Sequence, residues 1–441
     1  MLLVANGTVI TLGKSCKVIE NGAVAVEGDI IKEVGKTAEL RQKYSDAEYI
    51  DAEGRLIMPG MINTHMHFYS TFARGLALPE PPANFVEILE KLWWKLDKKL
   101  TLEDVYYSAL IPLIDCIKNG TTTVFDHHAS FGAITGSLDE INKACTEAGL
   151  RTCLCYEVSD REGKEKALES IEENRRFIKK CQENDDPMTK ATFGLHASLT
   201  LSPETLAKCA EVASELGIGV HIHTAEGIRD VEDSLDKYGM RVVERLRKYE
   251  LLGPRTIAAH CVHVNDDEIR ILAETDTNVV HNPESNMGNA VGCAPVIKML
   301  KNGVRVGMGT DGFTSDMFEG IKVANVLHKH DQGDPSASWA EVPRMIFENN
   351  SAIVKNFYDK PLGVLEPGAY ADIITIDYNP ATPLTADSFY PHLLFGVSGA
   401  MVNTTIVAGK VLMQDRKLKG IDEKEVAAKA RELAAKLWER F

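Results

Sequence analysis

Two histidines stand one residue apart at the end of an apolar run, in the stretch 57–67 that reads IMPGMINTHMH. In an extended strand, residues i and i+2 point to the same face, so His65 and His67 can converge on one metal ion if the strand ends at the mouth of a barrel. The pair alone would equally suit ordinary core histidines. Further polar residues at the ends of other strands would favour the metal site.

Such residues follow downstream, each at the end of another apolar run. The segments are 221–226 (HIHTAE), 258–263 (AAHCVH) and 307–312 (GMGTDG). Any one of them could be structural, but four strand ends that carry histidines and carboxylates are hard to produce by chance. Because barrels of alternating strands and helices place their chemistry at the carboxyl ends of the strands, the pattern predicts one polar catalytic rim.

Strands alternate with longer helical segments through the middle of the chain, which is typical of parallel βα units. Eight apolar runs are candidate strands, at 56–65, 122–126, 151–156, 192–196, 219–223, 256–260, 277–281 and 304–311. Helices are predicted at 102–118, 164–184, 203–216, 231–249, 266–274 and 295–302. Eight such units in roughly 300 residues predict an α/β fold, a TIM-like (β/α)₈ barrel.

The two ends of the chain predict a second, smaller unit. Short strands with hairpin turns precede residue 56, and further strands are expected between residues 369 and 414. Neither set alone buries enough surface, so we expect one small β-sandwich built from both termini. The expected division is 1–56 and 365–418 for the two sandwich halves, 57–364 for the barrel and 419–441 for an amphipathic terminal helix.

Composition excludes several classes of partner. With 441 residues, 44% of them hydrophobic and 26% charged, the chain is typical of a soluble globular protein. A formal net charge of -15 argues against nucleic acid and anionic membranes as partners. The nine cysteines are an odd number without a dense framework, which favours free thiols, and no run approaches the roughly 20 apolar residues of a membrane span. Without a recognisable signal peptide, a cytoplasmic location is expected.

At this point the sequence resembles the amidohydrolase superfamily, and within it the mononuclear metal-dependent deaminase and chlorohydrolase branch. The resemblance covers nearly the whole chain, including the split terminal sandwich. Five motifs carry it: PGMINTHMH at 59–67, HTAE at 223–226, AHC at 259–261, HNP at 281–283 and GTDG at 309–312. SsnA-type aminohydrolases are the subgroup that the sequence most resembles, and the family resemblance implies a homodimer.

The resemblance implies that one divalent metal ion is bound by His65, His67, His223 and Asp311. Three neutral imidazoles and one carboxylate suit Zn²⁺ first and Fe²⁺ second, and they leave a position for water. Coordination lowers the pKa of that water toward about 7, so that hydroxide is available near neutral pH.

The same resemblance implies that Glu226, His260 and Asp311 are catalytic. Glu226 would take the proton of the attacking water and deliver it to a ring nitrogen, while His260 and Asp311 orient the nucleophile. Binuclear relatives carry a bridging lysine at the end of strand four. Here that end reads GLHAS at 194–198 and Lys190 lies at the opposite end, so a single metal is expected.

Candidate substrate contacts are less specific, and each has a structural alternative. They are His196, Arg74, His127, His128, Asn282 and Asn286. His196 resembles the family's substrate-contacting histidine, with packing as the alternative, and Arg74 would either hold a carbonyl or carboxylate or anchor the insertion at 77–99. That insertion, rich in proline and tryptophan, is either a lid over the site or an external helix.

These features predict a metal-dependent aminohydrolase that deaminates a purine-like, pterin or triazine-type heterocycle through metal-bound hydroxide and releases ammonia. Two alternatives stay open. The same nucleophile could open the ring of a cyclic amide or imide, or the chain could be a metal-binding partner subunit without turnover. Glu226 and His260 argue against the last, because a binding protein needs neither.

Overall fold

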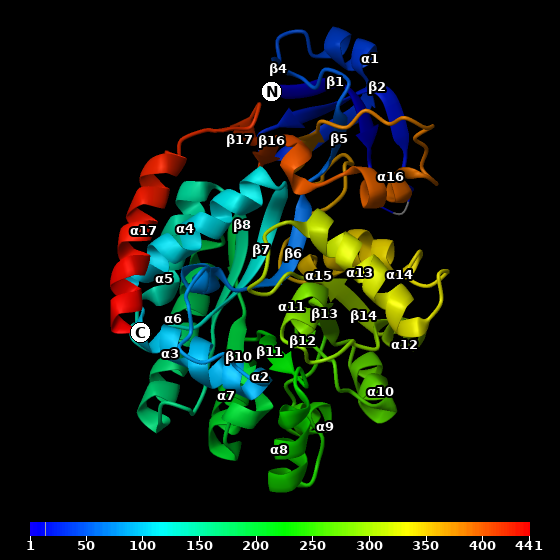
Figure 1. Ribbon diagram of the computed structural model, residues 1–441. Coiled ribbons are helices and arrows are strands. Elements are labelled where there is room, and N and C mark those ends of the chain that lie inside the picture. The colour runs from blue at the N-terminus through cyan, green and yellow to red at the C-terminus, as the bar shows by residue number, and fades with distance from the viewer. Residues whose placement is uncertain (14) are drawn as a thin grey trace.

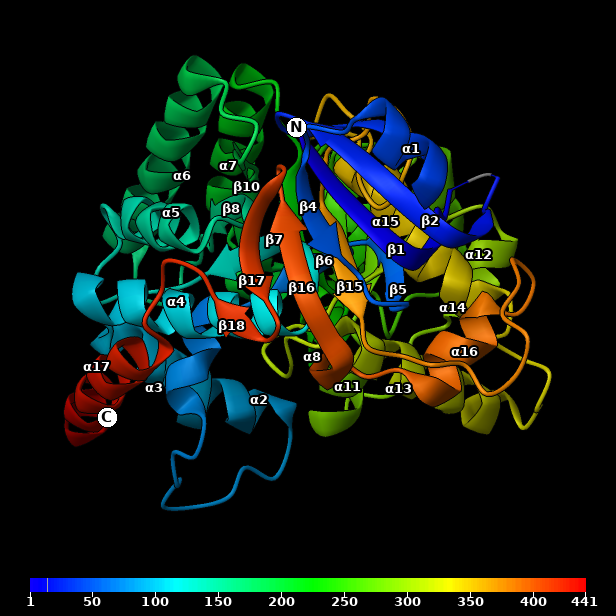
Figure 2. The same ribbon diagram turned by 90° about the horizontal axis from the view of Figure 1, so that it is seen from above.

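Both ends of the chain contribute to one mixed sheet, which lies above the barrel in Figure 1 and is seen from its outer side in Figure 2. Among the described residues, 1–13 and 15–441 of the computed structural model, this sheet has nine strands. Its order is β18 (Lys417–Leu418), β17 (Lys410–Gln414), β16 (Val402–Val407), β15 (Ile373–Ile376), β5 (Leu56–Pro59), β1 (Leu2–Ile10), β2 (Val18–Glu27) and β3 (Ile30–Lys36), with β4 (Glu48–Asp51) paired to β1.

The N-terminal and C-terminal halves of this sheet share one apolar core. A bridge between Ile30 and Tyr370 brings β3 back to the segment before β15. Val24 and Ile57 from the first half then pack with Ile406 from the second, all fully buried. The prediction that both termini build one small β unit is therefore confirmed, and the strands of the expected sandwich belong to a single nine-stranded sheet in the described chain.

Parallel strands form the larger unit, in two sheets that are joined at both edges. They are β6 (Met61–Met66), β7 (Thr121–His128), β8 (Arg151–Tyr156) and β9 (Thr189–Ala191) in one sheet, and β10 (Phe193–Ala197), β11 (Val220–Thr224), β12 (Ile257–His260), β13 (Asn278–His281) and β14 (Arg305–Met308) in the other. Parallel bridges link Val158 to Leu195 and Met66 to Asp311. Since β9 and β10 are one segment interrupted at Thr192, eight strands surround the core, as predicted.

Helices cover the outside of these strands (Figure 1). The main ones are α4 (Leu102–Lys118), α5 (Ser137–Ala148), α6 (Lys164–Asn184), α7 (Pro203–Glu215), α8 (Ile228–Tyr238), α9 (Val242–Lys248), α10 (Asp266–Glu274), α11 (Pro283–Gly288), α12 (Val296–Lys301), α13 (Met317–Gln332) and α15 (Asn350–Val354). The single helix predicted at 231–249 is wrong. It is two helices, because Gly239 ends α8 in the left-handed conformation with φ of 65°.

Gly60 is the point at which the chain passes from the terminal sheet to the barrel. β5 pairs with β1 and β15, whereas β6 pairs with β7, so the one strand predicted over 56–65 is two strands in different sheets. A Cβ atom at Gly60 would lie 2.1 Å from Thr122 Oγ1, so only glycine permits this close approach of β5–β6 to β7.

The C-terminal helix α17 (Glu423–Arg440) packs along α4 and reaches the segment that follows the first barrel strand. Trp438 Nε1 donates a hydrogen bond of 2.8 Å to the carbonyl of Phe72, and Arg440 pairs with the buried Asp104 at 2.7 Å. Among the described residues, no helix has the length and apolar character needed to cross a membrane.

Candidate active site

Three histidines are held by their Nδ1 atoms so that their Nε2 atoms are free. His67 Nδ1 donates to the carbonyl of His127, and His223 Nδ1 donates to the carbonyl of His196 at 3.0 Å. His65 Nδ1 lies 2.8 Å from His221 Nε2. A carbonyl can only accept, so in the neutral rings of His67 and His223 the lone pair is on Nε2. This arrangement is how metal-binding histidines are oriented in proteins.

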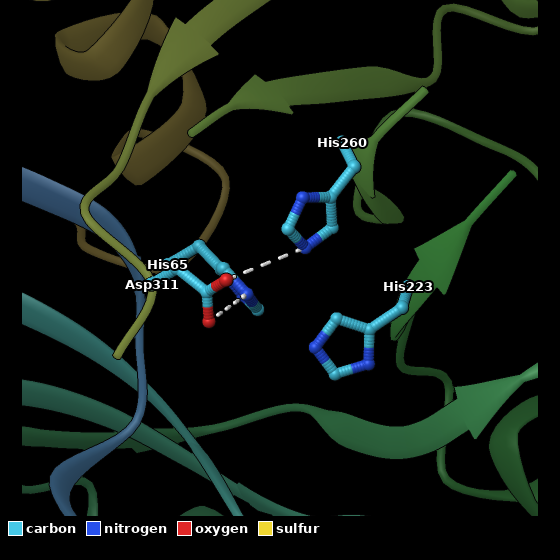
Figure 3. A group of neighbouring side chains, drawn as sticks. All are labelled: His65, His223, His260 and Asp311. Atoms are coloured by element: carbon cyan, nitrogen blue, oxygen red, sulfur yellow. Dashed lines mark ion pairs between the residues drawn. The ribbon is translucent and has the colours of Figure 1, made fainter. Parts of the chain in front are cut away.

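The free nitrogens face the carboxylate of Asp311, which follows β14. His67 Nε2 lies 2.9 Å from Asp311 Oδ1 and 3.1 Å from His223 Nε2, and His65 Nε2 lies 3.7 Å from Asp311 Oδ1. Figure 3 draws the ion pairs of Asp311 with His65 and with His260, and the ring of His223 lies on the same side of Asp311 as His260. Single ligand atoms of His65, His223, His260 and Asp311 all lie within 4.8 Å of one another, and all four residues are buried.

The donor set fits a divalent metal ion. Within the described chain, the buried His65 Nε2 has no hydrogen-bond partner, an arrangement that a metal–nitrogen bond would satisfy. Burial lowers the pKa of His65 to about 3 and that of His223 well below its usual range, so both rings are neutral, as ligands must be. Burial opposes protonation of His67 as well, but Asp311 outweighs it and raises the pKa to about 9. A bound cation would displace that proton.

Glu226 and His260 lie beside this centre. His260 Nε2 is 3.6 Å from Glu226 Oε2 and 3.9 Å from Asp311 Oδ2, and His260 Nδ1 is held by Asn286 Oδ1 at 2.8 Å. Burial raises the pKa of Glu226 to about 7, and the charge of Asp311 adds to burial while His260 opposes it. A carboxyl group with its pKa near neutrality can both accept and donate a proton at working pH.

The backbone at these positions is unusual. His260 and Asp311 have φ values of 73° and 55°, in the left-handed region that residues other than glycine rarely adopt. Ser285 also donates a hydrogen bond to Asp311 Oδ2, so the carboxylate is oriented from two sides. Such conformations concentrate at functional sites, where the surrounding structure over-determines them.

A pocket opens over the centre, and the 77–99 insertion supplies part of its wall. The insertion folds into α2 (Phe85–Ile88), a π-helical turn (Leu89–Trp93), α3 (Trp94–Leu96) and a 3₁₀ turn (Asp97–Lys99). Six of its side chains line the pocket: Phe85, Val86, Leu89, Trp93, Trp94 and Asp97. The insertion was expected to be either a lid over the site or an external helix. Its position over the pocket is that of the lid.

Of the predicted substrate contacts, His196 lines the pocket, with Nδ1 2.7 Å from Thr200 Oγ1. The other five lie outside the described lining. Arg74 follows a 3₁₀ helix (Phe68–Ala73), is exposed and pairs with Asp115 at 3.5 Å. The other four are buried. Asn286 accepts a hydrogen bond from His260, and the carbonyl of His127 accepts one from His67. His128 forms a hydrogen bond with Ser130, and Asn282 packs against Gly309.

Sequence reasoning missed a second polar group in the pocket wall. Glu157 follows β8, Asp97 comes from the insertion, and Arg161 forms a buried ion pair with Asp97. Burial opposes ionisation of Glu157, but His196, His127 and Arg161 outweigh it and hold its pKa below the usual range. Glu157 directly follows a predicted strand, so its position gave a signal. Asp97 and Arg161 lie in irregular segments and gave none.

A bridging lysine is not brought to this centre. Lys190 lies on β9, and its Nζ is 3.3 Å from the exposed Asp185, which precedes the amino end of that strand. His196 occupies the carboxyl end of the same segment, in the pocket wall. The described site therefore has the components of a mononuclear centre.

Comparison with known proteins agrees with this architecture. The model of the Amidohydrolase family matches residues 56–412, and a model described as the bacterial imidazolonepropionase-like composite domain matches residues 22–47. The 5'-deoxyadenosine deaminase of Methanosarcina barkeri is 36% identical, over 99% of this chain and 98% of the relative. The 5-methylthioadenosine/S-adenosylhomocysteine deaminase of Syntrophomonas wolfei is also 36% identical, over 99% of both chains.

A solved structure is similar over the same extent. The adenosine deaminase of Xanthomonas campestris, with bound zinc, superposes with a TM-score of 0.88 at 26% identity, covering 99% of this chain and 98% of that one. The finer resemblance to SsnA-type aminohydrolases stays a prediction. The match over most of the length, together with the barrel and its cluster of histidines and aspartate, shows that the chain belongs to the amidohydrolase family.

Proposed function

We propose that this protein is a zinc-dependent aminohydrolase that deaminates the purine ring of an adenosine-type nucleoside and releases ammonia. The observation that carries the proposal is the pairing of a buried cluster able to bind a metal with the carboxyl group of Glu226, in the wall of one pocket. The two relatives at 36% identity are named as deaminases of adenosine derivatives, which supports this choice of heterocycle.

The metal would be held by His65, His67, His223 and Asp311, which offer three imidazole nitrogens and a carboxylate. When bound, zinc lowers the pKa of a coordinated water and stabilises negative charge that develops on the attacked carbon's oxygen. Zinc is preferred over Fe²⁺ because a similar structure contains it.

Glu226 is the proton-transfer group in this proposal. Its carboxylate accepts a proton from the attacking water and passes it to a ring nitrogen, which makes the ring carbon more electrophilic. His260, held by Asn286, lies within 4 Å of both Glu226 and Asp311, so it can orient the nucleophile and stabilise the developing charge. Departure of the amino group as ammonia then needs one further proton, which Glu226 can take from the new hydroxyl on the attacked carbon and deliver to the amino group.

The test is a substrate screen with zinc-loaded protein. Adenosine, 5'-deoxyadenosine, guanine, a pterin, an aminotriazine and a cyclic imide are supplied separately, and ammonia and ring-opened product are assayed in parallel. We expect stoichiometric ammonia and the deaminated nucleoside from the two adenosine compounds. Ring opening without ammonia would instead support the cyclic-amide reaction, and tight binding without any product would support a non-catalytic metal-binding subunit.

Three coarser features complete the proposal. A homodimer is proposed from the family resemblance, and sedimentation would test it. A cytoplasmic location is proposed because the cysteines of the described chain are free thiols. The domain bounds 1–56, 57–364, 365–418 and 419–441 also remain proposals, which limited proteolysis would test.

A further inference from the structure

The pocket has a second polar wall that the proton-transfer chemistry does not use. It consists of Glu157 after β8, His196 at the end of β10 and Asp97 from the insertion. Single ligand atoms of Glu157, His196 and His223 lie within 4.8 Å of one another, so the wall adjoins the metal-binding cluster. A substrate held over the metal would therefore meet these side chains as well.

Glu157 carries an oxygen that the protein itself leaves available. The nearest cationic neighbours of Oε1 are Arg161 Nη2 and His196 Nε2, both at 3.8 Å, which is beyond hydrogen-bond distance. The other oxygen, Oε2, faces His127 Nδ1 at 3.5 Å. Glu157 is 3% exposed and lines the pocket, so this carboxylate is held almost entirely inside the protein with a free acceptor atom.

Asp97 extends the same surface of acceptors. Its Oδ2 pairs with Arg161, while its buried Oδ1 has no hydrogen-bond partner among the described residues. Arg161 stacks on Phe131 and on Trp94, with its guanidinium carbon 4.3 Å and 5.3 Å from the two ring centroids. Aromatic rings and Asp97 hold Arg161 in the wall, where its positive charge offsets the two carboxylates.

A buried acceptor without a partner is costly unless a ligand supplies the missing donor. An ionised carboxylate has no hydrogen to donate, so it selects groups with O–H or N–H and rejects isosteres that lack them. In an adenosine-type nucleoside the ring carries its amino group at the attacked carbon, and the remaining strong donors are the hydroxyls of the sugar.

We propose that Glu157 is a specificity-determining residue that accepts a hydrogen bond from a sugar hydroxyl of the substrate. The assignment rests on the proposed nucleoside deaminase function. Asp97 is the neighbouring acceptor for a second hydroxyl, and it links recognition of the sugar to the insertion that covers the pocket. Glu157 takes no part in the transfer of protons at the attacked carbon.

The test compares adenosine with 2',3'-dideoxyadenosine, using zinc-loaded wild-type protein and the variant Glu157→Leu, which removes both acceptor oxygens. The wild type should favour adenosine in kcat/KM by roughly 10-fold to 100-fold, the range for a hydrogen bond to a charged group. In E157L this preference should fall toward one, through a rise in KM for adenosine, while the dideoxy compound changes little. Zinc content should stay at the wild-type level.

A matched control is Glu162→Gln, five residues along the same segment, because Glu162 pairs with Lys98 at 3.2 Å and lies outside the described pocket lining. It should keep the wild-type preference. If E157L lowers kcat/KM equally for both nucleosides, or if the wild type shows no preference, the assignment is overturned although the deaminase function stands. If E157L does not fold, Glu157→Met, which also lacks both acceptor oxygens, is measured in the same way. Failure of the wild type to deaminate either nucleoside would overturn both.

Discussion

The two walls of the pocket differ in how their polar groups are satisfied. On the metal side, the histidines are fixed through Nδ1 and direct free Nε2 atoms toward Asp311, as a cation requires. On the insertion side, Glu157 and Asp97 surround a buried arginine and keep acceptor atoms free. In the proposed function, the metal-side wall performs the reaction and the insertion-side wall selects the substrate. Changes on the two sides should therefore have different kinetic signatures.

Removal of a metal ligand should have the largest effect. In His223→Ala the centre loses a nitrogen that lies 3.1 Å from His67 Nε2, so zinc content should fall well below one equivalent. Ammonia release should drop by about 10⁴-fold or more, because the nucleophile is no longer activated. Elemental analysis with an ammonia assay measures both. Full activity without bound metal would remove the distinction between the walls.

Glu226→Gln should separate proton transfer from metal binding. The amide keeps the shape of the side chain but cannot accept the proton of the attacking water, so kcat should fall by about 10²-fold to 10⁴-fold. Zinc content and KM should change little, because Glu226 is not one of the proposed ligands. A variant that retains zinc and wild-type kcat would exclude Glu226 from the mechanism.

The dependence of kcat/KM on pH tests the same role of Glu226 as a base. Glu226 must be ionised to act as a base, and in the protein without metal its pKa is raised to about 7, mainly by burial. On the acid side of this pKa, kcat/KM should fall by about tenfold per pH unit as protonation removes the base. The charge of bound zinc favours the ionised form of Glu226 and so lowers its pKa. The acid limb of the kcat/KM profile should therefore lie below pH 7. A profile that is flat through this region would contradict the assignment.

Arg161→Lys should have the smallest effect and a different signature. Lysine keeps the positive charge but loses the planar group that stacks on Phe131 and Trp94 and pairs with Asp97. We expect KM for the nucleoside to rise by about 3-fold to 10-fold, with kcat and zinc content near the wild-type values. Steady-state kinetics and elemental analysis test this. Loss of zinc in R161K would show that the two walls are not independent.

The metal side could be predicted from the sequence because its residues directly follow short apolar runs. His65, His223, His260 and Asp311 each stand within a few residues of the end of a barrel strand, so the βα pattern fixes both their place and their common rim. The barrel followed from the same alternation, and the β unit from both termini followed from hairpin signals at the two ends of the chain. The exact boundaries of the strands and helices could not be predicted, since Gly60 divides one apolar run between two sheets and Gly239 divides one helical run into two helices.

The insertion side was not predicted, because its residues come from segments whose conformation depends on tertiary packing. Asp97 begins the last of several short helical turns, and Arg161 lies in a loop, so no spacing indicates that they meet. Arg74 was expected at the substrate, but the chain turns outward after the 3₁₀ helix and the side chain pairs with Asp115 instead. Asn282 and Asn286 lie on the expected segment but outside the described pocket lining, and Asn286 instead bonds His260.

The central claim is that one metal ion at His65, His67, His223 and Asp311 supports deamination. Titration of metal-free protein with zinc, followed by the rate of ammonia release from 5'-deoxyadenosine, tests it most directly. The rate should rise linearly and stop rising at one equivalent of zinc per chain. Full ammonia release by the metal-free protein, or a break at two equivalents, would contradict it.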